Sequence, residues 1–115
     1  TPSGVAAALC LGADSVNTAR GFMFALGCIQ ALQCNKNTCP TGITTHDPKL
    51  QKGLDPELKA VRVANYARNL LHEVEVVAHS CGVLNPYELG REHAYLVTAN
   101  GLPQRLTDRY PNTAT

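Results

Sequence analysis

The stretch CIQALQCNKNTCP, residues 28–40, contains three cysteines in a C-x5-C-x4-C pattern that a proline closes. Cys28, Cys34 and Cys39 flank a polar turn. A structural cysteine packs as a small apolar side chain in a core, and a polar turn offers no core for three of them. Cysteines bind metals as thiolates, and soft sulfur ligands select zinc, copper or iron-sulfur clusters. The spacing therefore predicts that these three cysteines bind a metal centre.

Zinc is the simplest alternative to an iron-sulfur cluster, with His46 completing a set of three cysteines and one histidine. Zinc sites usually contain cysteine pairs separated by two to four residues, whereas the gaps here are five and four residues. The spacing favours an iron-sulfur cluster, and three ligands favour a cubane that lacks one iron. Cys10 and Cys81 lie in apolar helical segments, where we expect small buried thiols.

The composition limits the classes of partner and compartment. Ten basic residues balance nine acidic ones, without the basic stripe that nucleic-acid binding needs, so we expect no nucleic-acid partner. Five cysteines are an odd number, which favours a reducing, cytoplasmic compartment over a disulfide framework. The apolar run over residues 21–32 is shorter than the roughly 20 residues that span a bilayer, so we expect no membrane span in this segment. Because the chain begins at Thr1 without a leader, we expect a fragment of a longer protein.

The N-terminal half has the order of elements typical of an α/β barrel, in which a ligand-binding loop follows the C-terminal end of a strand. We expect a helix that Ser3 caps and Gly12 ends, then a short strand over residues 13–19. A second, buried helix is expected over residues 22–33, carrying Cys28 in its second half. One strand cannot form a barrel, so the isolated chain should be mostly α-helical with at most one or two short strands.

The C-terminal half is expected to be helical. Asp55-Pro56 should open a long helix that Gly82 ends, and its mixed charges indicate a solvated face. The capping-box pattern at Asn85 should open a shorter helix toward Tyr95, and beyond Thr98 we expect loop or tail. The predicted divisions are residues 1–53 with the cysteine loop, residues 54–99 as a helical segment, and residues 100–115 as a tail.

Residues 12–48, GADSVNTARGFMFALGCIQALQCNKNTCPTGITTHDP, resemble the end of the central FMN domain of glutamate synthases. The resemblance implies a (β/α)8 TIM barrel that binds FMN, with this chain as its C-terminal piece plus a cluster loop and C-terminal helices. It implies that Cys28, Cys34 and Cys39 hold a 3Fe-4S cluster beside the flavin. The stretch at residues 39–42, Cys-Pro-Thr-Gly, matches the family's Cys-Pro-x-Gly after the third ligand.

The same resemblance assigns the loop Ala19, Arg20 and Gly21 to the FMN phosphate. These residues follow the presumed last barrel strand, where such barrels bind phosphate with backbone N–H groups. No residue is assigned a catalytic role in the chemical step.

The resemblance implies an oxidoreductase of the glutamate synthase type, acting on CH-NH2 donors. It would form glutamate from 2-oxoglutarate and ammonia derived from glutamine. Electrons from ferredoxin or a nicotinamide-dependent subunit would pass through the cluster to FMN, which would reduce 2-iminoglutarate. The isolated chain is expected to be inactive and to associate with copies of itself through residues 21–32. Two alternatives remain: a small zinc-binding or interaction module, and a related FMN oxidoreductase with another substrate.

Overall fold

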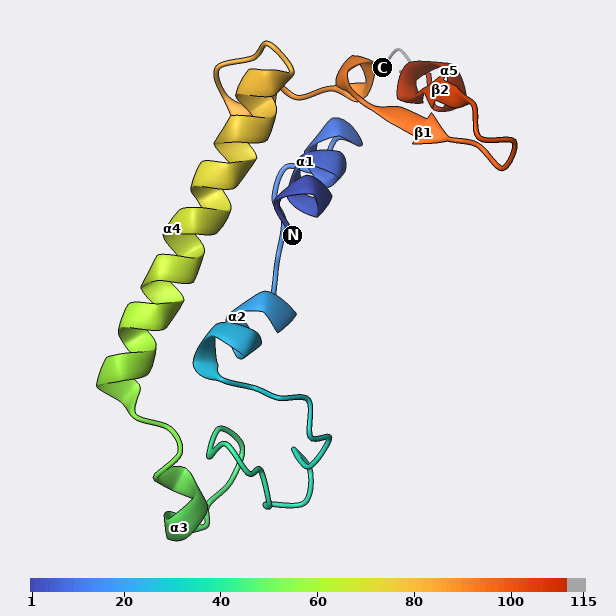
Figure 1. The fold of residues 1–115 in the computed structure, drawn as a ribbon. Helices are drawn as coiled ribbons and strands as arrows, with labels where there is room; N and C mark the ends of the chain where they lie inside the picture. The colour runs from blue at the N-terminus through green and yellow to red at the C-terminus, as the bar shows by residue number, and fades with distance from the viewer. Residues whose placement is uncertain (112–115) are drawn as a thin grey trace. The chain divides into compact units, whose positions relative to one another are not determined.

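The computed structural model describes residues 1–111 and shows a mostly helical chain with one small sheet (Figure 1). The chain divides into two compact units. Unit 1 comprises Thr1–Asn17 and the described residues from Leu70 onward, and unit 2 comprises Thr18–Asn69. This content agrees with the predicted mostly helical chain with one or two short strands.

Unit 1 begins with helix α1, Pro2–Cys10. The Thr1 hydroxyl accepts a hydrogen bond from the backbone N–H of Gly4 at 3.2 Å, so Thr1 is the cap and the prediction of Ser3 was wrong. Proline at the first helical position explains this start, because the N–H that proline lacks has no intrahelical partner there. Gly12, with φ of 97°, follows the helix in the left-handed region, as predicted.

The strand predicted over residues 13–19 is absent. These residues have no regular secondary structure beyond a bend at Asp14. Within residues 1–111 the only sheet is an antiparallel pair near the C-terminus, so no parallel neighbour is present to accept the backbone hydrogen bonds that define a strand. The segment instead leads directly into helix α2.

The C-terminal part of unit 1 differs from the prediction. In place of one helix toward Tyr95, the chain forms two 3-10 turns, η1 (Pro86–Glu88) and η2 (Arg91–His93), because Leu89 and Gly90 between them are extended. Strand β1 (Tyr95–Val97) lies within the segment predicted to be helical. Beyond Thr98, in place of a loop or tail, the chain forms strand β2 (Pro103–Arg105) and helix α5 (Leu106–Arg109). The strands are antiparallel, and Leu96 is opposite Gln104.

The core of unit 1 draws on three parts of the chain that are distant in sequence: α1, the C-terminal half of α4 and the segment after residue 88. Its buried residues are Ala6, Leu9, Cys10, Val74, Ala78, Leu89 and Leu106. Cys81 packs partly buried against this core. Cys10 is therefore a buried core thiol, as the sequence predicted, whereas Cys81 is only partly buried beside the core.

Unit 2 contains helices α2 (Arg20–Leu26) and α3 (Pro48–Gln51) and the first half of α4 (Pro56–Ser80). Helix α2 ends at Gly27, whose φ is 107°, so the predicted helix through Gln33 was too long and Cys28 lies after it. None of the α2 residues is fully buried, against the prediction of a buried helix. The rings of Phe22 and Tyr66 meet edge to face at 5.0 Å, which joins α2 to α4.

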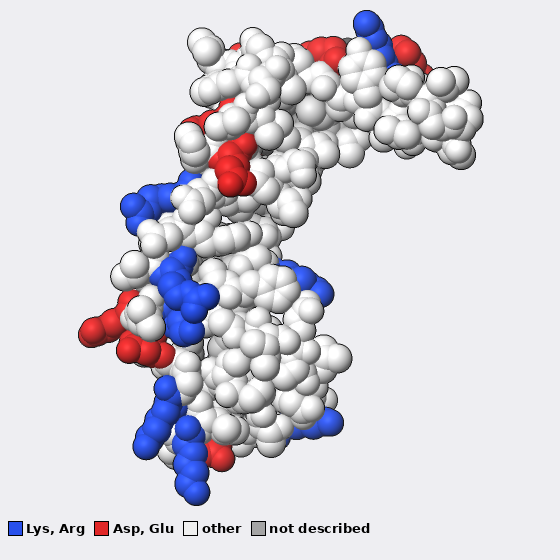
Figure 2. Space-filling view, viewed as in Figure 1, with Lys and Arg blue, Asp and Glu red and all other residues white. Residues whose placement is uncertain are grey.

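Helix α4 begins and ends as the sequence predicted. The Asp55 carboxylate accepts hydrogen bonds from the N–H groups of Glu57 at 3.0 Å and Leu58 at 3.2 Å. The helix ends just before Gly82, whose φ is 86°. On the face drawn in Figure 2, basic and acidic side chains are interspersed, and neither sign forms a continuous patch. Within residues 1–111, no helix has both the length and the apolar character needed to cross a bilayer.

Candidate functional site

The cysteine loop, residues 28–47, follows α2 and has an unusual backbone. The non-glycine residues with positive φ that the structure describes all lie between the first and third cysteines: Gln30, Leu32 and Asn37, at 55° to 60°. Residues with a Cβ rarely adopt a positive φ, and those that do are more frequent at functional sites. The loop between the cysteines therefore has a defined local structure.

Asn37 joins the two halves of the cysteine loop. Its side-chain oxygen accepts a hydrogen bond from the backbone N–H of His46 at 2.6 Å, and its carbonyl accepts one from the hydroxyl of buried Thr45 at 2.7 Å. The amide of Gln51 in turn donates to the Thr45 carbonyl at 3.1 Å. His46 thus contributes to the loop through its backbone, while its side chain is exposed.

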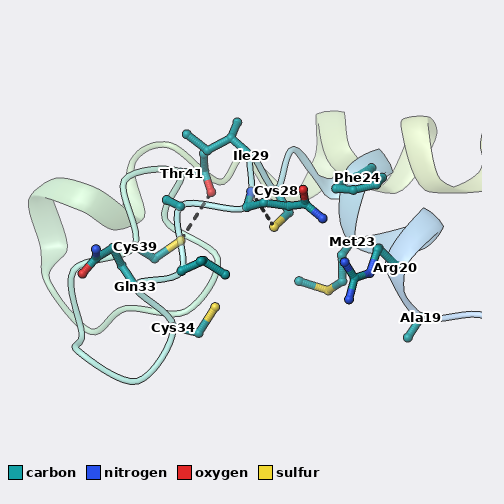
Figure 3. A pocket seen from close by; sticks show the side chains of 13 residues that line it. Ala19, Arg20, Met23, Phe24, Cys28, Ile29, Gln33, Cys34, Cys39 and Thr41 are labelled. Atoms are coloured by element: carbon teal, nitrogen blue, oxygen red, sulfur yellow. Dashed lines mark hydrogen bonds between the residues drawn. The ribbon is translucent and has the colours of Figure 1, made fainter.

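The structure brings the three predicted cysteines to one pocket, which we call the cysteine pocket. It has a volume of about 320 Å³, and its walls include Cys28, Cys34 and Cys39 together with Ala19 and Arg20. Figure 3 shows Cys34 and Cys39 on one side of the pocket and Arg20 on the other, with Cys28 between them in this view. The two segments that the sequence singled out, the cysteines and the residues before α2, therefore border the same space.

Gly21, the third residue predicted to contact phosphate, lies against the ring of Tyr66. A Cβ added at Gly21 would lie 2.7 Å from Cζ of the Tyr66 ring, closer than atoms can pack. Glycine at this position is therefore explained by the close approach of α4, and Gly21 is not among the residues that line the cysteine pocket.

The wall of the cysteine pocket is mainly apolar, with polar groups from Arg20, Gln30, Gln33 and Thr41. Met23 and Phe24 of α2 and Ile29 of the loop contribute to it. An apolar wall with few polar groups is typical of a small-molecule or cofactor site.

The thiols of the pocket are all free and are not equivalent. Cys28 and Cys39 are partly buried, whereas Cys34 is exposed. The Cys39 sulfur lies 3.4 Å from the Thr41 hydroxyl, and this hydrogen bond, followed by one from the Thr44 backbone, lowers the pKa of Cys39 to about 6. The Thr44 hydroxyl itself has no partner of normal geometry and adds little. Cys39 is therefore mostly thiolate at neutral pH.

The three thiols do not converge on one point. Within residues 1–111 no group of three or more His, Cys, Asp or Glu side chains is arranged to ligate a single metal ion. The alternative in which His46 completes a zinc site gains no support, because its exposed side chain does not line the cysteine pocket.

Two contacts to sulfur were not identified from the sequence. They are the Thr41 hydroxyl at Cys39 and the backbone N–H of Gln30, which donates to the Cys28 sulfur at 3.5 Å. In each case the donor lies two residues after the cysteine. This spacing could have indicated the contacts, because hydroxyl and N–H groups in a turn commonly bond a side chain two positions earlier.

Comparison with known proteins places the chain in a family. Residues 1–84 match the family model described as "Conserved region in glutamate synthase". The chain is 50% identical over 93 residues to the glutamate synthase large subunit-like protein YerD of Bacillus subtilis, covering 81% of this chain and 18% of that protein. It is 41% identical over 76 residues to the archaeal-type glutamate synthase [NADPH] of Thermotoga neapolitana, covering 66% of this chain and 15% of that protein.

The archaeal glutamate synthase [NADPH] of Methanocaldococcus jannaschii is also 41% identical over 76 residues, with the same coverage of 66% and 15%. The chain thus spans less than a fifth of the length of each of these relatives. No solved structure matches it. The match over most of the chain, together with these relatives, shows that the chain belongs to the glutamate synthase family.

Proposed function

We propose that this chain is the cluster-binding end of an iron-sulfur flavoprotein that forms glutamate from 2-oxoglutarate and glutamine-derived ammonia. The single observation that carries the proposal is the cysteine pocket, where Cys28, Cys34 and Cys39 share a wall with Ala19 and Arg20. Membership of the glutamate synthase family supports an oxidoreductase of this type. In the complete protein the residues before α2 would close a (β/α)8 barrel.

The donor set of three cysteines fits a 3Fe-4S cluster, and the spacing of these cysteines favours the cluster over one zinc ion. Thiolate is the usual protein ligand of iron-sulfur clusters, and Cys39 is already mostly thiolate at neutral pH. In a cluster each cysteine binds a different iron, so the thiols must surround a volume, whereas a zinc ion needs all its ligands around one point. Cys28, Cys34 and Cys39 all line the cysteine pocket, so each thiol borders the space that such a cluster would occupy.

We assign the FMN phosphate to the backbone at Ala19, Arg20 and Gly21. Arg20 is exposed and lines the pocket, and no side chain caps the start of α2, so its first N–H groups remain available to an anion. Bound FMN and the cluster would supply the hydride and single-electron chemistry, while these residues hold and orient the cofactors.

The electron donor we favour is nicotinamide-dependent rather than ferredoxin, because NADPH stands in the names of the relatives from Thermotoga and Methanocaldococcus. We place the protein in a reducing, cytoplasmic compartment, which its five free cysteines support. Exposed Phe24, Ile29 and Leu32 support association of isolated copies through residues 21–32.

The test is the iron content of the complete protein with Cys34→Ser, compared with Cys81→Ser. Cys34 is an exposed pocket thiol, whereas Cys81 packs against the core of unit 1. We expect Cys34→Ser to lose the visible absorption of the cluster and most of its iron, and Cys81→Ser to retain both. Equal iron content in the two variants would contradict the proposal.

A further inference from the structure

Two of the three pocket sulfurs have hydrogen-bond partners in the loop, and the third has none among the described residues. The Thr41 hydroxyl oxygen lies 3.4 Å from the Cys39 sulfur, and the Gln30 backbone nitrogen lies 3.5 Å from the Cys28 sulfur (Figure 3). Thr41 contacts sulfur through its side chain, whereas Gln30 and Thr44 do so through the backbone. The Thr41 contact can therefore be removed without changing the backbone.

The direction of the Thr41 contact depends on the state of Cys39. In a free thiol either the sulfur or the hydroxyl oxygen can be the donor. A cysteine that binds a metal is deprotonated, so its sulfur can only accept. With a metal centre bound at Cys39, the Thr41 hydroxyl must therefore be the donor.

Packing fixes the backbone position of Thr41. A Cβ added at Gly53 would lie 3.0 Å from the Thr41 carbonyl carbon, and one added at Gly42 would lie 2.5 Å from the Leu50 carbonyl oxygen. Gly42 is buried and has φ of 79°. The two glycines thus bring the chain after Cys39 against the end of α3, which limits how far the hydroxyl can move from the sulfur.

We propose that Thr41 is a positioning residue that raises the reduction potential of the iron-sulfur centre held by Cys39. The inference rests on the proposed function. A donated hydrogen bond withdraws negative charge from a ligand sulfur, which stabilises the more negative, reduced state. One electron enters from the protein's electron donor, no bond breaks, and the Thr41 proton remains on its oxygen.

The experiment is a redox titration, with dithionite as reductant and detection by electron paramagnetic resonance, on anaerobically purified complete protein. We compare wild type with Thr41→Val, which keeps the shape and removes the hydroxyl, and with Thr41→Ser, which restores the donor. Thr38→Val is the matched control, because the Thr38 hydroxyl donates to the Gln33 side chain at 3.3 Å and not to a sulfur.

We expect a more negative midpoint potential for Thr41→Val, and potentials close to wild type for Thr41→Ser and Thr38→Val. If Thr41→Val does not assemble the centre, Thr41→Ala replaces it, with the same negative shift expected. An unchanged potential in the hydroxyl-free variant, with iron content intact, overturns the role of Thr41 and leaves the proposed function standing. A wild-type protein without an iron-sulfur centre overturns both.

Discussion

At the scale of single residues, the environment of Cys39 distinguishes it from the other pocket thiols. The Thr41 hydroxyl and the Thr44 backbone stabilise its charged form and lower its pKa to about 6. Cys10 shows the opposite case, because burial in the core of unit 1 and the nearby Cys81 raise its pKa. One sequence thus contains a thiol with a lowered pKa and another that packs as a small apolar side chain.

Alkylation should reveal this difference in the metal-free chain. Thiolate is the nucleophile, so the reaction of Cys39 with iodoacetamide should be close to its maximum at pH 7 and fall as the pH drops through about 6. Thr41→Val should move this midpoint to higher pH, because the largest stabilising contact is lost. Mass spectrometry of the labelled peptides measures both. A Cys39 midpoint near 8.5, the ordinary value for cysteine, would contradict the assignment.

The sequence was sufficient to find the three cysteines, since spacing alone identified them, and the structure brings them to one pocket. Their metal and the phosphate role of Ala19, Arg20 and Gly21 remain predictions. The sequence did not reveal Thr41, because a threonine near a cysteine is common and only the fold shows that its hydroxyl meets the sulfur.

At the scale of elements, local signals predicted helix boundaries well where a cap or a glycine marks them. Asp55-Pro56 and Gly82 bound α4 as expected. Helix α2 was predicted too long, because apolar residues continue to Leu32 although left-handed Gly27 ends the helix. The β1–β2 hairpin was missed, although Asn100-Gly101 is a recognised turn signal. The expected strand at residues 13–19 depends on parallel neighbours that no local pattern can supply.

Asp55 should contribute measurably to the stability of α4. Asp55→Ala removes the acceptor of two backbone N–H groups, so we expect the free energy of unfolding to fall by about 1 kcal/mol. Asp55→Asn is the matched control and should lose much less, since asparagine is an equally good cap. Urea denaturation followed by circular dichroism measures the three proteins. Equal losses for alanine and asparagine would show that capping is not the source of the effect.

At the scale of the whole molecule, the chain consists of two units that differ in what they contribute. Unit 2 contains the cysteine pocket and the special backbone of the loop. Unit 1 contains the hydrophobic core, which includes Leu89 and Leu106. Leu89 and Leu106 lie beyond residues 1–84, the part that matches the family model. The core of unit 1 therefore depends on residues outside that part.

Leu106 should therefore matter more to stability than its position near the C-terminus suggests. It is 3% exposed, whereas Leu102 in the same segment is 63% exposed. We expect Leu106→Ala to lower the free energy of unfolding by about 2–5 kcal/mol, and Leu102→Ala to change it by about 0.5 kcal/mol or less. Chemical denaturation measures both variants. Similar small effects would mean that the C-terminal segment does not contribute to the core.

The most direct test of the central claim is the content of iron, acid-labile sulfide and zinc in anaerobically purified protein, together with its visible spectrum. The proposed 3Fe-4S cluster at the three pocket thiols predicts about three iron and four sulfide ions per chain, with a brown colour. About one zinc per chain, with neither iron nor sulfide, would contradict the claim and make the loop a structural zinc site.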